Sequence, residues 1–144
     1  TRPVWPLILL DTNVLSALMQ ERPDRVVVEW LDQRPAESVW LPALTVFEVR
    51  FGLELLAPGS RRRRLEQAFA QALEDDFQGR VVPFDRAAAE AAGRIAAQRR
   101  RVGRPVEVRD VQLAGIAEAR KASLATRNLR HFEGLGLELL NPWS

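Results

Sequence analysis

The stretch that decides the fold is residues 7–19, LILLDTNVLSALM, in which a polar Asp-Thr-Asn triplet joins an apolar run to a helical pattern. Four consecutive aliphatic residues, 7–10, are typical of a strand that is buried on both faces. The apolar spacing of residues 14–19 then predicts an amphipathic helix. A buried strand that leads directly into a helix is the building unit of a parallel α/β sheet.

The same alternation of short strands and helices continues along the chain. Further strands are predicted at residues 38–41, 80–84, 124–126 and 137–140. Helices are predicted at residues 24–31, 44–55, 61–77, 85–101 and 110–117, and in the second of these one face carries Leu44, Phe47, Phe51 and Leu55. This order predicts an α/β sandwich around a mainly parallel sheet. No linker or repeat divides the chain, so residues 1–144 are expected to form a single domain.

The composition excludes several kinds of site. The chain has 144 residues, no cysteine and one histidine, His131, which excludes disulfides, thiolate metal sites and multi-histidine zinc sites. The formal net charge is only +2, and the high pI of about 10.3 reflects the near-exclusive use of arginine as the basic residue. No apolar run reaches the roughly 18 residues that a membrane-spanning helix needs. We therefore expect a cytoplasmic protein without membrane contact.

Three acidic residues lie where ligands of parallel sheets usually bind, near the strand ends. Asp11 directly follows the first predicted strand, Glu48 lies early in the helix after the second, and Asp110 opens the helix before the fourth. Oxygen ligands without histidine or cysteine favour a hard cation, Mg²⁺ or Mn²⁺, which suits phosphoryl chemistry. The alternative is helix capping, because Asp11 and Asp110 are good N-cap residues and Thr45 with Glu48 matches a capping box.

Four segments, in order along the chain, resemble the motifs of PIN-domain proteins. The segments are residues 9–16 (LLDTNVLS), 44–52 (LTVFEVRFG), 110–117 (DVQLAGIA) and 124–128 (LATRN), the last followed by His131-Phe132 and Asn141-Pro142-Trp143. They span essentially the whole chain, and the last one is similar to the VapC/FitB branch of the family. The resemblance implies a three-layer α/β/α sandwich with a short, mainly parallel central sheet.

The resemblance also implies a function. It points to a Mg²⁺- or Mn²⁺-dependent endoribonuclease, the toxin of a toxin–antitoxin pair, which hydrolyses RNA phosphodiesters with a metal-activated water. By position, Asp11, Glu48 and Asp110 would be the catalytic, metal-binding acids, and Thr12 and Asn13 would orient Asp11. The implied partners are RNA as substrate, a VapB- or FitA-like antitoxin, and a second copy of the chain in a homodimer.

The position of the family's fourth acid differs here. Asn128 and His131 occupy the two places where that acid is expected, and neither is an anion, which favours one divalent ion over two. Asn128 remains a possible ligand through its carbonyl oxygen. Glu107, three residues before Asp110, is another possible ligand, with a solvated loop acid as the alternative. The missing anion leaves open a second function, a degenerate PIN fold that binds RNA or a protein partner without cleavage.

Several arginines are candidates for contacts with RNA phosphate. Arg50 and Arg127 adjoin the proposed site. Four consecutive arginines begin the helix predicted at 61–77, where positive charge opposes the helix dipole, and acids at 74–76 oppose it at the other end. This reversed pattern favours a role in binding RNA phosphate or an acidic partner, with a solvated charge run as the alternative. The four are Arg61, Arg62, Arg63 and Arg64.

Overall fold

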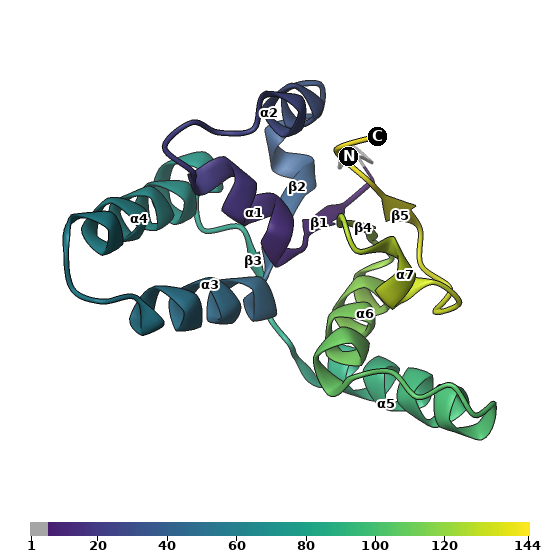
Figure 1. Ribbon diagram of the computed structural model, residues 1–144. Helices are drawn as coiled ribbons and strands as arrows, with labels where there is room; N and C mark the ends of the chain where they lie inside the picture. The colour runs from purple at the N-terminus through teal and green to yellow at the C-terminus, as the bar shows by residue number, and fades with distance from the viewer. Residues whose placement is uncertain (1–5) are drawn as a thin grey trace.

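The computed structural model describes residues 6–144, which form a parallel sheet with helices on both faces (Figure 1). The strands are β1 (Ile8–Leu10), β2 (Val39–Pro42), β3 (Val81–Val82), β4 (Ser123–Ala125) and β5 (Leu139–Leu140). Their order is β3-β2-β1-β4-β5, and every neighbouring pair is parallel. The first strand is therefore central, and Ile8 is in register with Val39 on one side and with Ser123 on the other. The predicted parallel α/β sheet is confirmed.

The helices begin close to where the sequence predicts. They are α1 (Thr12–Met19), α2 (Arg25–Asp32), α3 (Ala43–Leu55), α4 (Ser60–Gln71), α5 (Arg86–Arg101), α6 (Val108–Arg120) and α7 (Leu129–Phe132), with a 3₁₀ turn η1 (Ala36–Ser38). Aspartates cap three of them: Asp11, Asp24 and Asp85 accept backbone N–H groups at the starts of α1, α2 and α5. No helix within residues 6–144 is both long enough and apolar enough to cross a membrane.

Two apolar cores lie on opposite faces of the sheet. Successive residues of a strand point to opposite faces, so Leu10 packs in a core with α1 to α4 while Leu9 packs in a core with α5 and α6. Figure 1 shows the first group of helices on one side of the strands and the second group on the other. The expected three-layer sandwich is confirmed.

The helix predicted at residues 61–77 is interrupted. Regular α-helix ends at Gln71, and a π-helical turn, η2 (Ala72–Asp76), follows it. The backbone N–H of Phe77 donates to the carbonyl of Ala72 at 2.8 Å, which closes this wider turn. Phe77, directly after this turn, lies in the same core as Phe69.

The apolar face of α3 that the sequence suggests for packing is largely exposed. Phe47, Phe51 and Leu55 are 64%, 56% and 71% exposed, and the two phenylalanine rings stack with centroids 6.2 Å apart. The buried side chains of α3 are Thr45, Val49 and Leu53. The exposed set and the buried set of residues both recur at helical spacing, so periodicity alone does not predict which set is buried. Because α3 buries the face that carries Thr45, Val49 and Leu53, Glu48 lies beside the carboxyl end of β1.

One glycine allows α5 and α6 to pack closely on their face of the sheet. A Cβ at Gly115 would lie 2.4 Å from the carbonyl oxygen of Ala88 and 2.7 Å from the Cβ of Ala92. Only hydrogen fits at this crossing. The close packing fixes the start of α6, and therefore the position of Asp110, relative to the sheet.

Candidate active site

Three carboxylates meet at the carboxyl end of the central strands. Asp11 follows β1 directly, and its backbone N–H donates to the carbonyl of Ala125, which extends the β1–β4 ladder by one step. Glu48 lies in the second turn of α3, which follows β2. Asp110 lies in the first turn of α6. We call these three residues, Asp11, Glu48 and Asp110, the acidic cluster.

Asp11 is fixed from several directions. It is 1% exposed, and its Oδ2 accepts a hydrogen bond of 2.8 Å from the hydroxyl of Thr126. The Asn13 side-chain amide donates to Oδ2 at 3.4 Å, while its own carbonyl oxygen accepts the backbone N–H of Arg127. Oδ1 accepts the backbone N–H of Thr12 at 2.8 Å. Asp11 is therefore both the predicted N-cap and a member of the acidic cluster, so the two interpretations of this residue are compatible.

The capping interpretation of Glu48 is wrong. Helix α3 begins at Ala43, so Thr45 is already inside the helix and cannot be its N-cap. The buried hydroxyl of Thr45 donates to the carbonyl of Leu10 at 2.8 Å instead. Glu48 reaches the acidic cluster, where its Oε1 accepts a hydrogen bond of 2.5 Å from the hydroxyl of Thr12. Thr12 therefore binds Asp11 through its backbone and Glu48 through its side chain.

Asp110 is also not an N-cap. Helix α6 begins at Val108, with Glu107 in the cap position, and Asp110 is buried. Glu107 makes no side-chain cap bond and lies exposed. It shares with Asp110 a shallow pocket of about 290 Å³ that His131 also lines. The Nδ1 atom of His131 lies 3.6 Å from Oδ2 of Asp110.

Arg109 occupies the centre of the acidic cluster, and the sequence interpretation missed it. Its Nη2 donates to Asp11 Oδ1 and Glu48 Oε1, its Nε donates to Glu48 Oε1 at 3.0 Å, and its Nη1 donates to Asp110 Oδ1 at 3.0 Å. Arg109 lies in the first turn of α6, where a cation opposes the helix dipole. The helix was expected to begin at residue 110, which left Arg109 outside it.

Electrostatics holds Arg109 in its charged form. Burial of the guanidinium lowers the pKa of Arg109, but its hydrogen bonds to Glu48, Asp11 and Asp110 outweigh that effect and raise the pKa above its ordinary value. One guanidinium nevertheless faces three carboxylates. The acidic cluster therefore keeps an excess of negative charge even with Arg109 in place.

The donor chemistry of the acidic cluster suits a hard divalent cation. All three side chains present carboxylate oxygen, the preferred ligand of Mg²⁺ and Mn²⁺, and they already surround one positive group, the guanidinium. With Arg109 between them, no three Asp, Glu or His side chains in residues 6–144 are arranged as a ready metal site. The side chains are therefore of the type that binds such an ion, and the guanidinium of Arg109 lies between them.

The remaining candidates lie outside the acidic cluster. Asn128 is the residue before α7, and its backbone N–H donates to the hydroxyl of Thr126. Arg127 lies with its guanidinium 4.6 Å from the ring centroid of Trp143. Arg50 and Arg62 pair with glutamates of α3 and α4. The other arginines of the α4 run are on the same helix and make no recorded contact with the acidic cluster: Arg61, Arg63 and Arg64.

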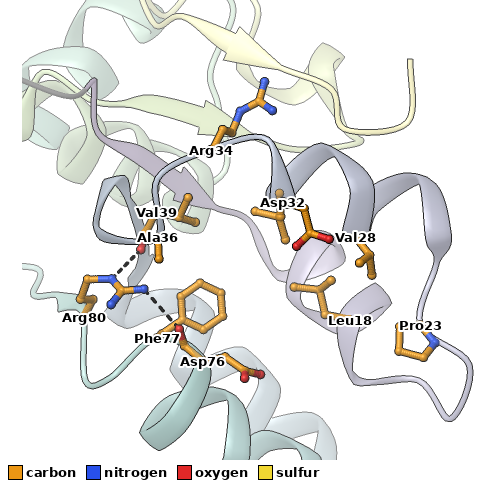
Figure 2. A pocket seen from close by; sticks show the side chains of 11 residues that line it. Leu18, Pro23, Val28, Asp32, Arg34, Ala36, Val39, Asp76, Phe77 and Arg80 are labelled. Carbon is orange, nitrogen blue, oxygen red and sulfur yellow. Dashed lines mark hydrogen bonds between the residues drawn. The ribbon is translucent and has the colours of Figure 1, made fainter.

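A second hollow lies at the opposite, amino end of the sheet (Figure 2). It measures about 490 Å³, and its polar side chains include Asp32, Asp76 and Arg80. Arg80 donates to the backbone carbonyls of Val39 and Asp76, as the dashed lines in Figure 2 show. Burial, with a smaller contribution from Asp75, raises the pKa of Asp76. This hollow collects no group of converging carboxylates, so the acidic cluster is the better candidate for catalysis.

A parallel sheet with clustered carboxylates at the carboxyl ends of its strands defines the class of protein: an α/β fold with an acidic site where parallel sheets usually bind their ligands. A model of the PIN domain family matches residues 8–135, and the chain belongs to that family. The VapC ribonuclease Y4jK of Sinorhizobium fredii is 37% identical over 137 residues, which is 95% of this chain and 98% of that protein. The toxin FitB of Neisseria gonorrhoeae is 34% identical, with 95% and 99% covered.

Solved structures agree with this assignment. The crystal structure of FitAcB from Neisseria gonorrhoeae superposes with a TM-score of 0.85 at 34% identity, covering 95% of this chain and 99% of that one. The sequence-based prediction of a PIN-domain protein close to VapC and FitB is confirmed.

Proposed function

We propose that this chain is the ribonuclease toxin of a toxin–antitoxin pair, and that it hydrolyses RNA with Asp11, Glu48 and Asp110 as ligands of Mg²⁺ or Mn²⁺. The observation that carries the proposal is the convergence of these carboxylates, from three separate elements, on one positive group. Isolated helix caps would not converge. The relatives named as a ribonuclease and a toxin support the same activity.

The chain's own residues prepare this chemistry by fixing the carboxylates. A bound divalent ion would supply a Lewis acid and lower the pKa of a water molecule for attack on phosphorus. Thr126 and Asn13 hold Asp11, and the Thr12 hydroxyl holds Glu48. Such supporting contacts keep ligands in place, so little reorganisation is needed on binding. No side-chain nucleophile is required.

The residues at the position of the family's fourth acid favour a single ion. Asn128 and His131 stand where a fourth acid is expected, and neither adds a negative charge to the acidic cluster.

Arg127 follows directly on Thr126, which binds Asp11, so its guanidinium is our first candidate for a phosphate contact. Arg50 is a weaker candidate, because two glutamates already bind it.

We extend the partners of the solved relatives to this chain. The structural relatives include FitAB bound to a DNA fragment, so the toxin of that complex is held by its antitoxin. We expect this chain to bind a VapB- or FitA-like antitoxin and to form a homodimer. Co-expression and co-purification with a VapB- or FitA-like antitoxin, followed by light scattering, measures both associations.

Cleavage of labelled structured RNA tests the catalytic proposal. The wild-type chain, freed of antitoxin, should cut with Mn²⁺ or Mg²⁺ and stop cutting with a chelator. The Asp110→Asn variant should lose at least about a hundredfold in rate, because it removes one charged ligand without changing shape. Asp85→Asn is the matched control, since Asp85 is also an acid at a helix start but caps α5 away from the acidic cluster.

A second function, binding without cleavage, follows if the cation never enters the acidic cluster. The observation that favours it is Arg109, which already occupies that place. Folded wild-type chain that binds RNA but shows no cation-dependent cutting on several RNAs would establish this alternative and overturn the first.

A further inference from the structure

Arg109 and a divalent cation need the same oxygen atoms. The guanidinium uses Oδ1 of Asp11, Oε1 of Glu48 and Oδ1 of Asp110, one oxygen from each proposed ligand. A cation bound to these carboxylates would also lie close to the positive guanidinium and be repelled by it. The two cations therefore exclude each other from the acidic cluster.

Arg109 is built to fill this place and is still able to leave it. Its planar fork of N–H groups matches several carboxylates at once, which the point charge of lysine cannot do. Its side chain is 28% exposed, against 2% for Asp11 and 9% for Asp110, so the guanidinium covers these two carboxylates on the solvent side, while Glu48 is 31% exposed beside it. Because part of the arginine side chain already faces solvent, rotation about its side-chain bonds can carry the guanidinium away from the carboxylates.

We propose that Arg109 is a built-in counter-ion that closes the acidic cluster, and that a divalent cation binds only after displacing it. This inference rests on the proposed function, because it takes the acidic cluster as the cation site. It divides the protein into an arginine-closed state and a cation-bound state. The concentration of the divalent cation sets the balance between the two states.

Closure by Arg109 weakens the apparent affinity for the cation. When only a fraction of the molecules is open, the apparent dissociation constant rises by the inverse of that fraction. Removing the guanidinium therefore strengthens cation binding, although it changes no ligand. A residue that merely supported the carboxylates would have the opposite effect when removed.

The test measures binding of Mn²⁺ alone to the full chain, without RNA, by electron paramagnetic resonance or calorimetry. Arg109→Gln should bind Mn²⁺ at least about tenfold more tightly than wild type. Arg109→Lys should be intermediate, because it keeps the charge but loses the fork. Arg86→Gln is the matched control: it removes the same charge from an arginine whose side chain is 92% exposed and pairs only with Glu90, and it should bind like wild type.

A second measurement needs no substitution. In wild-type protein the Nε–H of Arg109 donates to Glu48, so its nuclear magnetic resonance signal reports the closed state. Titration with Mg²⁺ should shift this signal in step with cation binding. It should leave the Nε–H signal of Arg80, which donates to the backbone carbonyl of Val39, in place.

The outcomes separate this inference from the proposed function. Equal Mn²⁺ affinity of Arg109→Gln and wild type, or weaker binding by the variant, overturns the inference and leaves the cation site standing. An Arg109 signal that stays fixed while Mg²⁺ binds overturns it as well. Absence of cation binding to both proteins overturns the cation site and the inference together.

Discussion

Arginine and carboxylate side chains form two networks in this protein, and they differ in balance. In the acidic cluster, one guanidinium, that of Arg109, faces the carboxylates of Asp11, Glu48 and Asp110. On the surface of α3 and α4, Arg50 and Arg62 face two glutamates. We call this second group the surface network, and its members are Arg50, Arg62, Glu54 and Glu66.

The difference in charge balance indicates which of the two networks can bind a further cation. The surface network has equal numbers of positive and negative groups, so it is already neutral. The acidic cluster is largely buried and has more negative than positive groups. Carboxylates that stay in excess in a partly buried place attract a further cation, whereas a balanced surface pair adds little stability and attracts nothing.

The largest difference should appear when one glutamate is neutralised in each network. Glu48→Gln removes a proposed cation ligand and should lower cation-dependent RNA cleavage at least about a hundredfold. Glu66→Gln makes the same chemical change in the surface network and should leave the rate within about twofold of wild type. Single-turnover cleavage under saturating Mn²⁺ measures both. Equal losses would mean that the two networks do not differ in function.

Removing the arginine of the acidic cluster should have the next largest effect. In the presence of a chelator, Arg109→Gln leaves three carboxylates facing one another and should lower the free energy of unfolding by about 1–3 kcal/mol. Added Mn²⁺ should restore more stability to this variant than to wild type, since it replaces the lost charge. Urea unfolding with and without Mn²⁺ gives both quantities, and an unchanged midpoint in chelator would contradict the expectation.

The same change in the surface network should cost much less. Arg62→Gln breaks contacts of 2.7 Å and 3.6 Å with Glu54 and Glu66, but both glutamates keep Arg50 as a partner, so we expect a loss of about 0.5 kcal/mol or less. High salt screens such pairs, so the difference from wild type should vanish near 1 M NaCl. A loss as large as that of Arg109→Gln would remove the distinction between the networks.

The smallest effect is expected for Asp24, a carboxylate that accepts a hydrogen bond from an uncharged side chain. The indole N–H of Trp143 donates to Asp24 at 2.9 Å, and this bond is the main cause of the lowered pKa of Asp24. A lowered pKa contributes stability above the ordinary value near 3.8, and that contribution fades as the pH falls through the folded-state pKa. Trp143→Phe should therefore flatten the acid side of the melting-temperature profile slightly. A steeper acid side would contradict this sign.

The sheet and the place of Asp11 could be predicted because their signals are local. A continuous aliphatic run, a capping Asp11 and the spacing of the next elements all lie within short windows, and the strands appear within a few residues of their expected places. Glu48 was found by position, but its capping interpretation failed, because α3 begins before Thr45 and the hydroxyl of Thr45 binds the carbonyl of Leu10 in β1. No local pattern contains that contact.

Arg109 could not be predicted from spacing, since its role depends on three residues from other parts of the fold and on its own rotamer. The face that α3 buries is a similar case, because both faces of the helix are apolar and only the surroundings decide between them. Local rules fail where tertiary contacts decide, and such places are often functional.

The order of the strands has a consequence for synthesis of the protein on the ribosome. β1, which Asp11 follows directly, is central, and its second neighbour, β4, is made only after α6. A nascent chain therefore holds Asp11 and Glu48 well before Asp110 emerges, and its sheet stays half built until then. Arg109 directly precedes Asp110, so the arginine and the last acid emerge together. The cell therefore never makes a complete set of carboxylates that lacks its own cation.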